Sequence, residues 1–159
     1  MSKIGIMGGT FNPIHMAHLI LAESAYEQLQ LDKILIMPSK KPPHKLHDPI
    51  ASDHHRIEMV KLAIKGNPHF ELSTMELERE GITYTADTLQ QLTKEYPENE
   101  YYFILGLDSL QQIEKWKTPD IIFHLAHIVA AGRYHFPKER IEGQVHRLEE
   151  IYHGKIHLL

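Results

Sequence analysis

Short runs of apolar residues alternate along the chain with longer segments in which apolar residues recur at helical spacing. The apolar runs predict strands, which lie at 3–7, 33–37, 70–77, 101–105, 127–131 and 155–158. The helical spacing and the capping residues predict helices, which lie at 16–29, 53–65, 85–96, 108–113 and 137–152, with one more beginning at Thr118-Pro119. Strand and helix therefore alternate from one end of the chain to the other, without an internal repeat.

This alternation, with strands that are apolar throughout, is typical of a parallel sheet that helices cover on both faces. We therefore predict an α/β fold, a single doubly wound parallel sheet with helices on both faces. In such folds ligands bind beyond the carboxyl ends of the strands. The loops expected there are 8–18, 38–48, 106–108 and 131–133.

The composition narrows the class of protein. The chain has 159 residues, 42% of them hydrophobic and 24% charged, which is typical of one soluble globular domain. It contains no cysteine, so disulfides, thiolate metal ligands and a cysteine nucleophile are excluded. The formal net charge of −4 argues against broad binding of nucleic acid, although a local basic pocket for a small anion remains compatible with it. No apolar run approaches the roughly 18–20 residues that span a bilayer, and no signal-peptide pattern is present, so we expect a cytoplasmic protein.

The segment GIMGGTFNPIHMAH, residues 5–18, joins the first predicted strand to the first predicted helix. A glycine pair at such a turn lets backbone N–H groups approach a phosphate, and the helix N-terminus adds partial positive charge. The segment lacks the Gly-Lys-Ser/Thr ending of the phosphate loop of kinases and motor proteins. Its glycines also lack the spacing of the dinucleotide fingerprint, and the second strand ends in Met37-Pro38-Ser39 without the acidic residue of that fingerprint. We therefore predict a phosphate-binding turn and not a redox cofactor site.

Two histidines, His15 and His18, stand three residues apart at the start of the helix, so both imidazoles project to the same side. An arbitrary histidine pair more often caps and packs a helix than binds a ligand. Behind a glycine-rich phosphate turn, we favour phosphate binding by both side chains. A zinc site would need at least one more suitable ligand nearby in the fold.

The stretch GGTFNPIHMAH resembles the nucleotidyltransferase motif G-G-x-F-[DN]-P-x-H-x-G-H, whose histidines bind and activate the phosphates of ATP. The resemblance extends over nearly the whole chain. Further segments are similar, in order and spacing, to bacterial nicotinate-nucleotide adenylyltransferases: MPSKKPPHK (37–45), DHHRIEMVKLAI (53–64), ELEREGITYTADTL (76–89), YYFILGLDSL (101–110) and KW (115–116).

This resemblance implies a Rossmann-like nucleotidyltransferase that transfers the adenylyl group of ATP to nicotinate mononucleotide. The products are nicotinate adenine dinucleotide and pyrophosphate, in NAD biosynthesis. The implied cofactor is Mg²⁺, held mainly by the phosphates of ATP, and no metal ligand from the protein is expected. The implied partners are the two nucleotides, with no nucleic acid and no membrane, and a homo-oligomer is left open.

The resemblance also implies roles for individual positions. It implies that His15 and His18 are the catalytic residues. The residues expected to bind ATP are Gly8, Gly9, Thr10, Phe11, His15, His18, Gly106 and Asp108. The residues expected to bind the mononucleotide are Lys45, Arg56, Tyr84, Thr85 and Trp116, to which we add Arg133 because it follows the fifth strand.

Several of these positions also have a purely structural explanation. Asp108 would cap a helix after a buried strand, Thr85 would be the N-cap of its helix, and Trp116 would anchor its loop. The pairs His47-Asp48 and His54-His55 suggest a metal-dependent phosphohydrolase, but the helical context that such a site needs is missing.

The sequence departs from the family pattern at three places. Ala17 replaces the glycine between the histidines, and Leu107 stands where an alanine is commoner. The sequence stops at Leu159, just before the position of a second ATP-phosphate motif of the family, I-S-S-T-x-I-R. We therefore expect one nucleotidyltransferase domain over 1–159 that lacks the C-terminal segment with that motif. Two alternatives stay open: a sister adenylyltransferase acting on nicotinamide mononucleotide or phosphopantetheine, and a non-catalytic nucleotide-binding module.

Overall fold

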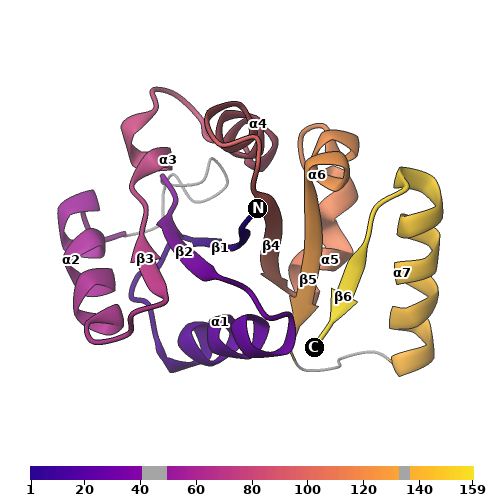
Figure 1. Cartoon of the computed structure of the whole chain (residues 1–159), viewed down its shortest axis with the longest axis horizontal. Helices are drawn as coiled ribbons and strands as arrows, with labels where there is room; N and C mark the ends of the chain where they lie inside the picture. Colours follow the sequence, from indigo (N-terminus) through magenta and orange to yellow (C-terminus); the bar gives the residue numbers. More distant parts are fainter. Residues whose placement is uncertain (41–49, 133–136) are drawn as a thin grey trace.

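The computed structural model of the chain describes residues 1–40, 50–132 and 137–159. These residues form a six-stranded sheet with the order β3-β2-β1-β4-β5-β6, in which every neighbouring pair is parallel (Figure 1). The strands are β1 (Lys3–Gly9), β2 (Lys33–Pro38), β3 (Phe70–Leu72), β4 (Glu100–Gly106), β5 (Ala126–Ala131) and β6 (Ile156–Leu158).

Helices connect the strands in sequence order. They are α1 (Met16–Gln28), α2 (Asp53–Ile64), α3 (Met75–Glu78), α4 (Thr85–Glu95), α5 (Leu107–Gln112), the 3₁₀ helix η2 (Ile113–Lys115), α6 (Pro119–Leu125) and α7 (Lys138–Tyr152). Ser52, one of the two caps that the sequence allows beside Asp53, is the N-cap of α2, and its hydroxyl accepts the backbone N–H of His55 at 3.3 Å. No helix in the described ranges is long and apolar enough to cross a membrane.

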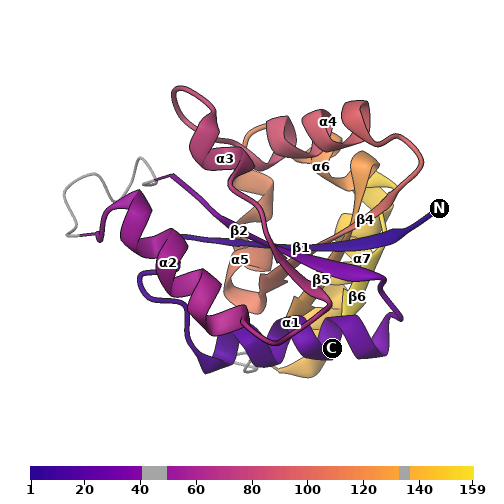
Figure 2. The ribbon, with the colours of Figure 1, turned by 60° about the vertical axis from the view of Figure 1, so that its left-hand side comes forward.

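The helices cover both faces of the sheet, as the sequence predicts (Figure 2). On one face, α1 and α2 pack on β1, β2, β4 and β5, in a core that includes Ala22, Ala25, Ile34, Ile36, Val60 and Ile104. On the other face, α4, α5, α6 and α7 pack on the same sheet, in a core that includes Ile6, Leu35, Met37, Leu89, Leu110, Ile122 and Ile141. The continuously apolar strands follow from this double coverage, because both faces of each central strand are withdrawn from water.

One predicted element is wrong. The stretch 70–77 is not a single strand, because β3 ends at Leu72 and the helix α3 begins at Met75. Hydrogen bonds from side chain and backbone turn the chain between the two elements. The Ser73 hydroxyl accepts the N–H of Met75 at 3.4 Å, and the carbonyl of Thr74 accepts the N–H of Leu77 at 3.0 Å.

The strand order reverses between β1 and β4, which is the topological switch point where ligands bind in open α/β sheets. Gly9 of β1 is paired in register with Pro38 of β2, and Gly106 of β4 with Ala131 of β5. The turns that follow these strands therefore begin at one edge of the sheet, as expected for the four predicted loops. Two predicted substrate residues in those loops, Lys45 and Arg133, lie outside the described residues.

Candidate active site

Gly5 and Gly8 both lie in β1, but their surroundings differ. A Cβ added to Gly5 would lie 2.5 Å from the Cδ1 of Ile34, so a larger residue there would force this side chain to move. A Cβ added to Gly8 would meet nothing closer than 3.9 Å, from the carbonyl of Met37 and the ring of Phe103. The packing around Gly8, at the end of β1 beside the switch point, is therefore looser than the packing around Gly5.

Phe11 follows this turn with a φ of 49°, in the left-handed region, and its side chain is 2% exposed. The Phe11 ring meets the ring of His18 edge to face, with 5.1 Å between centroids. Because the Phe11 side chain is buried, its contribution to ATP binding would come from its backbone.

The histidine pair is organised by the first turn of α1. The backbone N–H of His15, the N-cap, donates to Nδ1 of His18 at 3.1 Å, and the two rings stack with 3.9 Å between centroids. Burial, and secondarily the charge of His15, lower the pKa of His18 below its usual value. A neutral His18 that accepts at Nδ1 carries its proton on Nε2, and this N–H remains as a donor.

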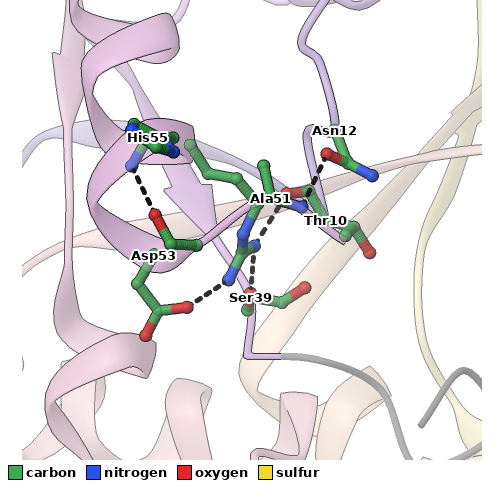
Figure 3. Close-up of polar contacts among 8 residues, drawn as sticks. Thr10, Asn12, Ser39, Ala51, Asp53 and His55 are labelled. Carbon is green, nitrogen blue, oxygen red and sulfur yellow. Dashed lines mark hydrogen bonds and ion pairs between the residues drawn. The ribbon is translucent and has the colours of Figure 1, made fainter. Parts of the chain in front are cut away.

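Arg56 of α2 joins this turn to the end of β2 through hydrogen bonds to backbone carbonyls of Thr10 and Ser39. Figure 3 labels Thr10, Ser39 and Asp53, the three residues that Arg56 binds. Its Nη1 donates to the carbonyl of Thr10 at 2.8 Å and to the carbonyl of Ser39 at 2.6 Å. Its Nη2 pairs with the carboxylate of Asp53 at 2.7 Å, and the Arg56 side chain is 1% exposed. The sequence predicts Arg56 as a substrate ligand, but the structure directs its guanidinium at the protein's own backbone.

Tyr84 and Trp116, the aromatic residues expected on the acceptor side, are linked through Lys117, the residue that follows Trp116 and contacts the Tyr84 ring. Trp116 is half-buried and meets Phe103 edge to face, with 6.1 Å between centroids, and the same Phe103 ring lies beneath Gly8. The ammonium of Lys117 lies 4.5 Å from the centroid of the Tyr84 ring. Phe103 is the contact that sequence reasoning missed, because within an apolar strand nothing distinguishes it from any other core residue.

A network of hydrogen-bonded side chains supports the start of α4. The Thr88 hydroxyl donates to the carboxylate of Glu76 at 2.6 Å and accepts from Nη2 of Arg79 at 2.7 Å. Thr88 also lies 3.3 Å from the carbonyl of Tyr84, the N-cap of α4. Burial raises the pKa of Glu76, and the bond from Thr88 and the charge of Arg79 offset part of that rise.

The structure corrects two predicted caps. Thr85 is the first residue of α4 and not its N-cap, which is Tyr84. Asp108 likewise lies in the first turn of α5, whose N-cap is Gly106, and its side chain is exposed. Neither side chain is needed to cap its helix, so the structural explanations that the sequence allowed for both positions lose their basis.

In the parts of the chain that the structure describes, no three His, Cys, Asp or Glu side chains lie together as a metal-binding group. The exposed carboxylate of Asp108 stands at the switch-point edge, where it could meet a cation carried by a phosphate ligand.

Comparison with known proteins agrees with this geometry. The family model of cytidylyltransferase-like proteins matches residues 6–148. A Lachnoclostridium phytofermentans protein named "Probable nicotinate-nucleotide adenylyltransferase" is 53% identical over 159 residues, which cover 100% of this chain and 80% of that protein. A Moorella thermoacetica protein of the same name is 41% identical over 158 residues, with coverages of 99% and 73%.

Solved structures share the fold. Plasmodium falciparum nicotinic acid mononucleotide adenylyltransferase complexed with NaAD superposes with a TM-score of 0.78 at 22% identity, covering 100% of this chain and 75% of that one. From the family model and the close relatives together, the chain belongs to the cytidylyltransferase-like nucleotidyltransferases and, within them, to the nicotinate-nucleotide adenylyltransferase family.

Proposed function

We propose that this chain transfers the adenylyl group of ATP to nicotinate mononucleotide, giving nicotinate adenine dinucleotide and pyrophosphate. The observation that carries the proposal is the stacked His15–His18 pair at the start of α1, shortly after the glycines that end β1 at the switch point. Relatives up to 53% identical bear the name of this activity.

The reaction requires mainly that the two substrates are positioned correctly relative to each other. A phosphate oxygen of the mononucleotide attacks the α-phosphorus of ATP and forms the new P–O bond, while the bond from that phosphorus to the bridging β-phosphate oxygen breaks. Pyrophosphate leaves with the electron pair. The attacking phosphate is already anionic at neutral pH, so the protein supplies orientation and stabilisation of the developing charge, with no covalent intermediate.

On the ATP side, the backbone of Gly8, Gly9 and Thr10 forms the phosphate cradle, with the N–H of Phe11 beside it. His18 donates from Nε2 to a phosphoryl oxygen, an arrangement supported by the bond that Nδ1 already accepts from His15. Bound triphosphate would raise the pKa of His18, because negative charge favours the imidazolium. Gly106 and Asp108 stand across the switch point, where the ribose of ATP would lie.

On the acceptor side, Trp116 offers an indole face to the pyridine ring. The backbone N–H groups at the start of α4, from Tyr84 and Thr85, are oriented for the carboxylate of nicotinate, since a helix N-terminus favours an anion. Lys45 and Arg133 remain predictions as ligands of the mononucleotide phosphate.

Mg²⁺ fits the donors that the described residues offer, provided that the phosphates of ATP and water supply most of its ligands. Asp108 is the side chain that would complete or orient that shell. When bound, the cation neutralises charge on the triphosphate and on the leaving pyrophosphate. A cytoplasmic location and a homo-oligomer stay predictions from the sequence.

Pyrophosphate release tests the proposal. The chain is incubated with ATP and Mg²⁺ and, separately, with nicotinate mononucleotide, nicotinamide mononucleotide or phosphopantetheine. We expect release with the nicotinate substrate about tenfold or more above the others, since a site that binds a carboxylate discriminates against its amide. A preference for another acceptor would instead identify a sister adenylyltransferase. ATP binding without release from any acceptor would indicate a non-catalytic nucleotide-binding module.

A further inference from the structure

Arg56 is an unusual residue for its place in the core. Its side chain is 1% exposed, and charged side chains are rarely buried to this degree unless they are paired. Its charge partner, Asp53, is 59% exposed, and in the described part of the chain Nε of Arg56 has no hydrogen-bond partner. A buried cation with one unmet donor is a poor source of stability, so its position calls for another explanation.

The two carbonyls that Arg56 binds belong to Thr10 and Ser39, the residues that directly follow the neighbouring strands β1 and β2. The ladder between β1 and β2 ends at the pair Gly9 and Pro38, and the N–H of Ser39 donates to the carbonyl of Gly9 at 2.8 Å. One residue further along each strand, the carbonyls of Thr10 and Ser39 both accept from Nη1 of Arg56. The guanidinium thus takes the place of the next rung, after the strands have separated.

This bond also sets the direction of a backbone donor. Within a trans peptide, the C=O of one residue and the N–H of the next point in opposite directions. Since the carbonyl of Thr10 points at Arg56, the N–H of Phe11 points away from Arg56. A second tie holds the same loop, because the side-chain oxygen of Asn12 accepts the N–H of Ala51 at 3.1 Å (Figure 3).

We propose that Arg56 is a positioning residue for nucleotidyl transfer: by binding the carbonyls of Thr10 and Ser39 it holds the phosphate turn in register with the end of β2 and presents the N–H of Phe11 to the phosphates of ATP. The inference rests on the proposed function. It also accounts for the guanidinium, whose planar fork reaches two carbonyls and a carboxylate at once, whereas the ammonium of a lysine is a compact point charge.

The test compares Arg56→Lys with the wild-type chain in the pyrophosphate assay, at saturating ATP and nicotinate mononucleotide. We expect kcat to fall about 100-fold, because a shift of the turn by about an ångström misplaces the reacting phosphate. The KM for nicotinate mononucleotide is expected to stay within about threefold of the wild-type value, because the acceptor side is untouched. Arg147→Lys is the matched control, since Arg147 is an exposed arginine of α7 paired with Glu114.

Two further readouts separate positioning from simple loss of stability. Guanidinium ion added to Arg56→Ala is expected to restore part of kcat, while ammonium ion at the same concentration does not. In the amide NMR spectrum of unliganded Arg56→Lys, the resonance of Phe11 is expected to shift, while that of Ile6 in β1 stays in place. This second readout needs no activity.

The outcomes are distinct. A wild-type chain that releases no pyrophosphate with any acceptor contradicts the proposed function. An active wild-type chain with Arg56→Lys within about twofold of its kcat overturns the role of Arg56 alone. Equal rescue of Arg56→Ala by guanidinium and ammonium, or an unshifted Phe11 amide in Arg56→Lys, would overturn it as well.

Discussion

The two sides of the site are supported in different ways. On the ATP side, Arg56 binds backbone carbonyls of the phosphate turn and of the end of β2. On the acceptor side, the start of α4 rests on side chains, with Thr88 between Glu76 and Arg79. Backbone carbonyls do not titrate, whereas the carboxyl of Glu76 does, and burial raises its pKa. The comparison teaches that backbone acceptors anchor the support of the phosphate turn, while a titratable carboxyl takes part in the support of the acceptor side.

The largest effect is expected for His18→Ala. Removing the Nε2 donor should lower kcat by about 10²–10³-fold, as loss of one preorganised donor to a developing charge does in other enzymes. Steady-state pyrophosphate release measures it. His146→Ala on α7 is the matched control, because His146 is exposed and on another helix. Turnover of His18→Ala close to that of the control would contradict phosphate binding by the histidine pair.

Thr88→Val tests the support of the acceptor side. The substitution keeps the shape but leaves Glu76 and Arg79 without their shared hydroxyl, which should cost about 1–3 kcal/mol in the free energy of unfolding. The KM for nicotinate mononucleotide should rise by roughly tenfold, and the KM for ATP should rise less. Urea unfolding and the kinetic assay measure the two effects.

Thr93→Val is the control on the same helix. In the described part of the chain, the buried Thr93 hydroxyl has no hydrogen-bond partner, so its removal should leave stability unchanged or slightly higher. If Thr88→Val and Thr93→Val behave alike, the network does not support the start of α4.

Trp116 allows a direct comparison of the two ligands. It is the single tryptophan of the sequence, so its fluorescence reports one place in the molecule. If the indole stacks on the pyridine ring, nicotinate mononucleotide should quench the emission by roughly a third or more, and ATP by much less. Equal quenching by both nucleotides would remove Trp116 from the acceptor side.

The smallest expected effect is a pH dependence of the stability that Glu76 contributes. Burial raises the pKa of Glu76, so the folded chain holds this proton more tightly than the unfolded chain. The associated stability is fully present below the usual pKa of a glutamate and is lost as the pH rises through the raised pKa. As the pH rises above the usual pKa of a glutamate, the stability of Glu76→Gln should therefore rise relative to wild type.

The Thr93→Val variant gives the contrast, because this substitution neither adds nor removes a titratable group. Its stability difference from wild type should stay constant over the same pH interval. Urea unfolding at each pH measures both differences. A constant difference for Glu76→Gln would mean that Glu76 does not titrate differently in the folded and unfolded chains.

Much of the fold follows from local patterns. The apolar runs at β1, β2, β4 and β5 predict buried parallel strands, because helices on both faces leave no polar side to them. The short strand β3 and the helix α3 were merged into one predicted strand. Hydrogen bonds of Ser73 and Thr74, and not apolar periodicity, decide where that chain turns.

In the candidate site, too, some features follow from the local sequence and others do not. The histidines and the glycine turn lie in one continuous segment, so their spacing alone predicts that they face one ligand. The contacts of Arg56 span 46 residues to Thr10 and 17 residues to Ser39, and no local pattern encodes them. Phe103 lies beneath Gly8 and beside Trp116 only because β1 and β4 pair across the switch point.

The central claim is the identity of the acceptor, and a competition measures it most directly. The chain is given ATP and Mg²⁺ with equal concentrations of nicotinate mononucleotide, nicotinamide mononucleotide and phosphopantetheine, and the dinucleotide products are identified by mass. We predict that nicotinate adenine dinucleotide makes up about nine-tenths or more of the product. A product mixture led by the nicotinamide or phosphopantetheine adduct, or no adduct at all, would contradict the account.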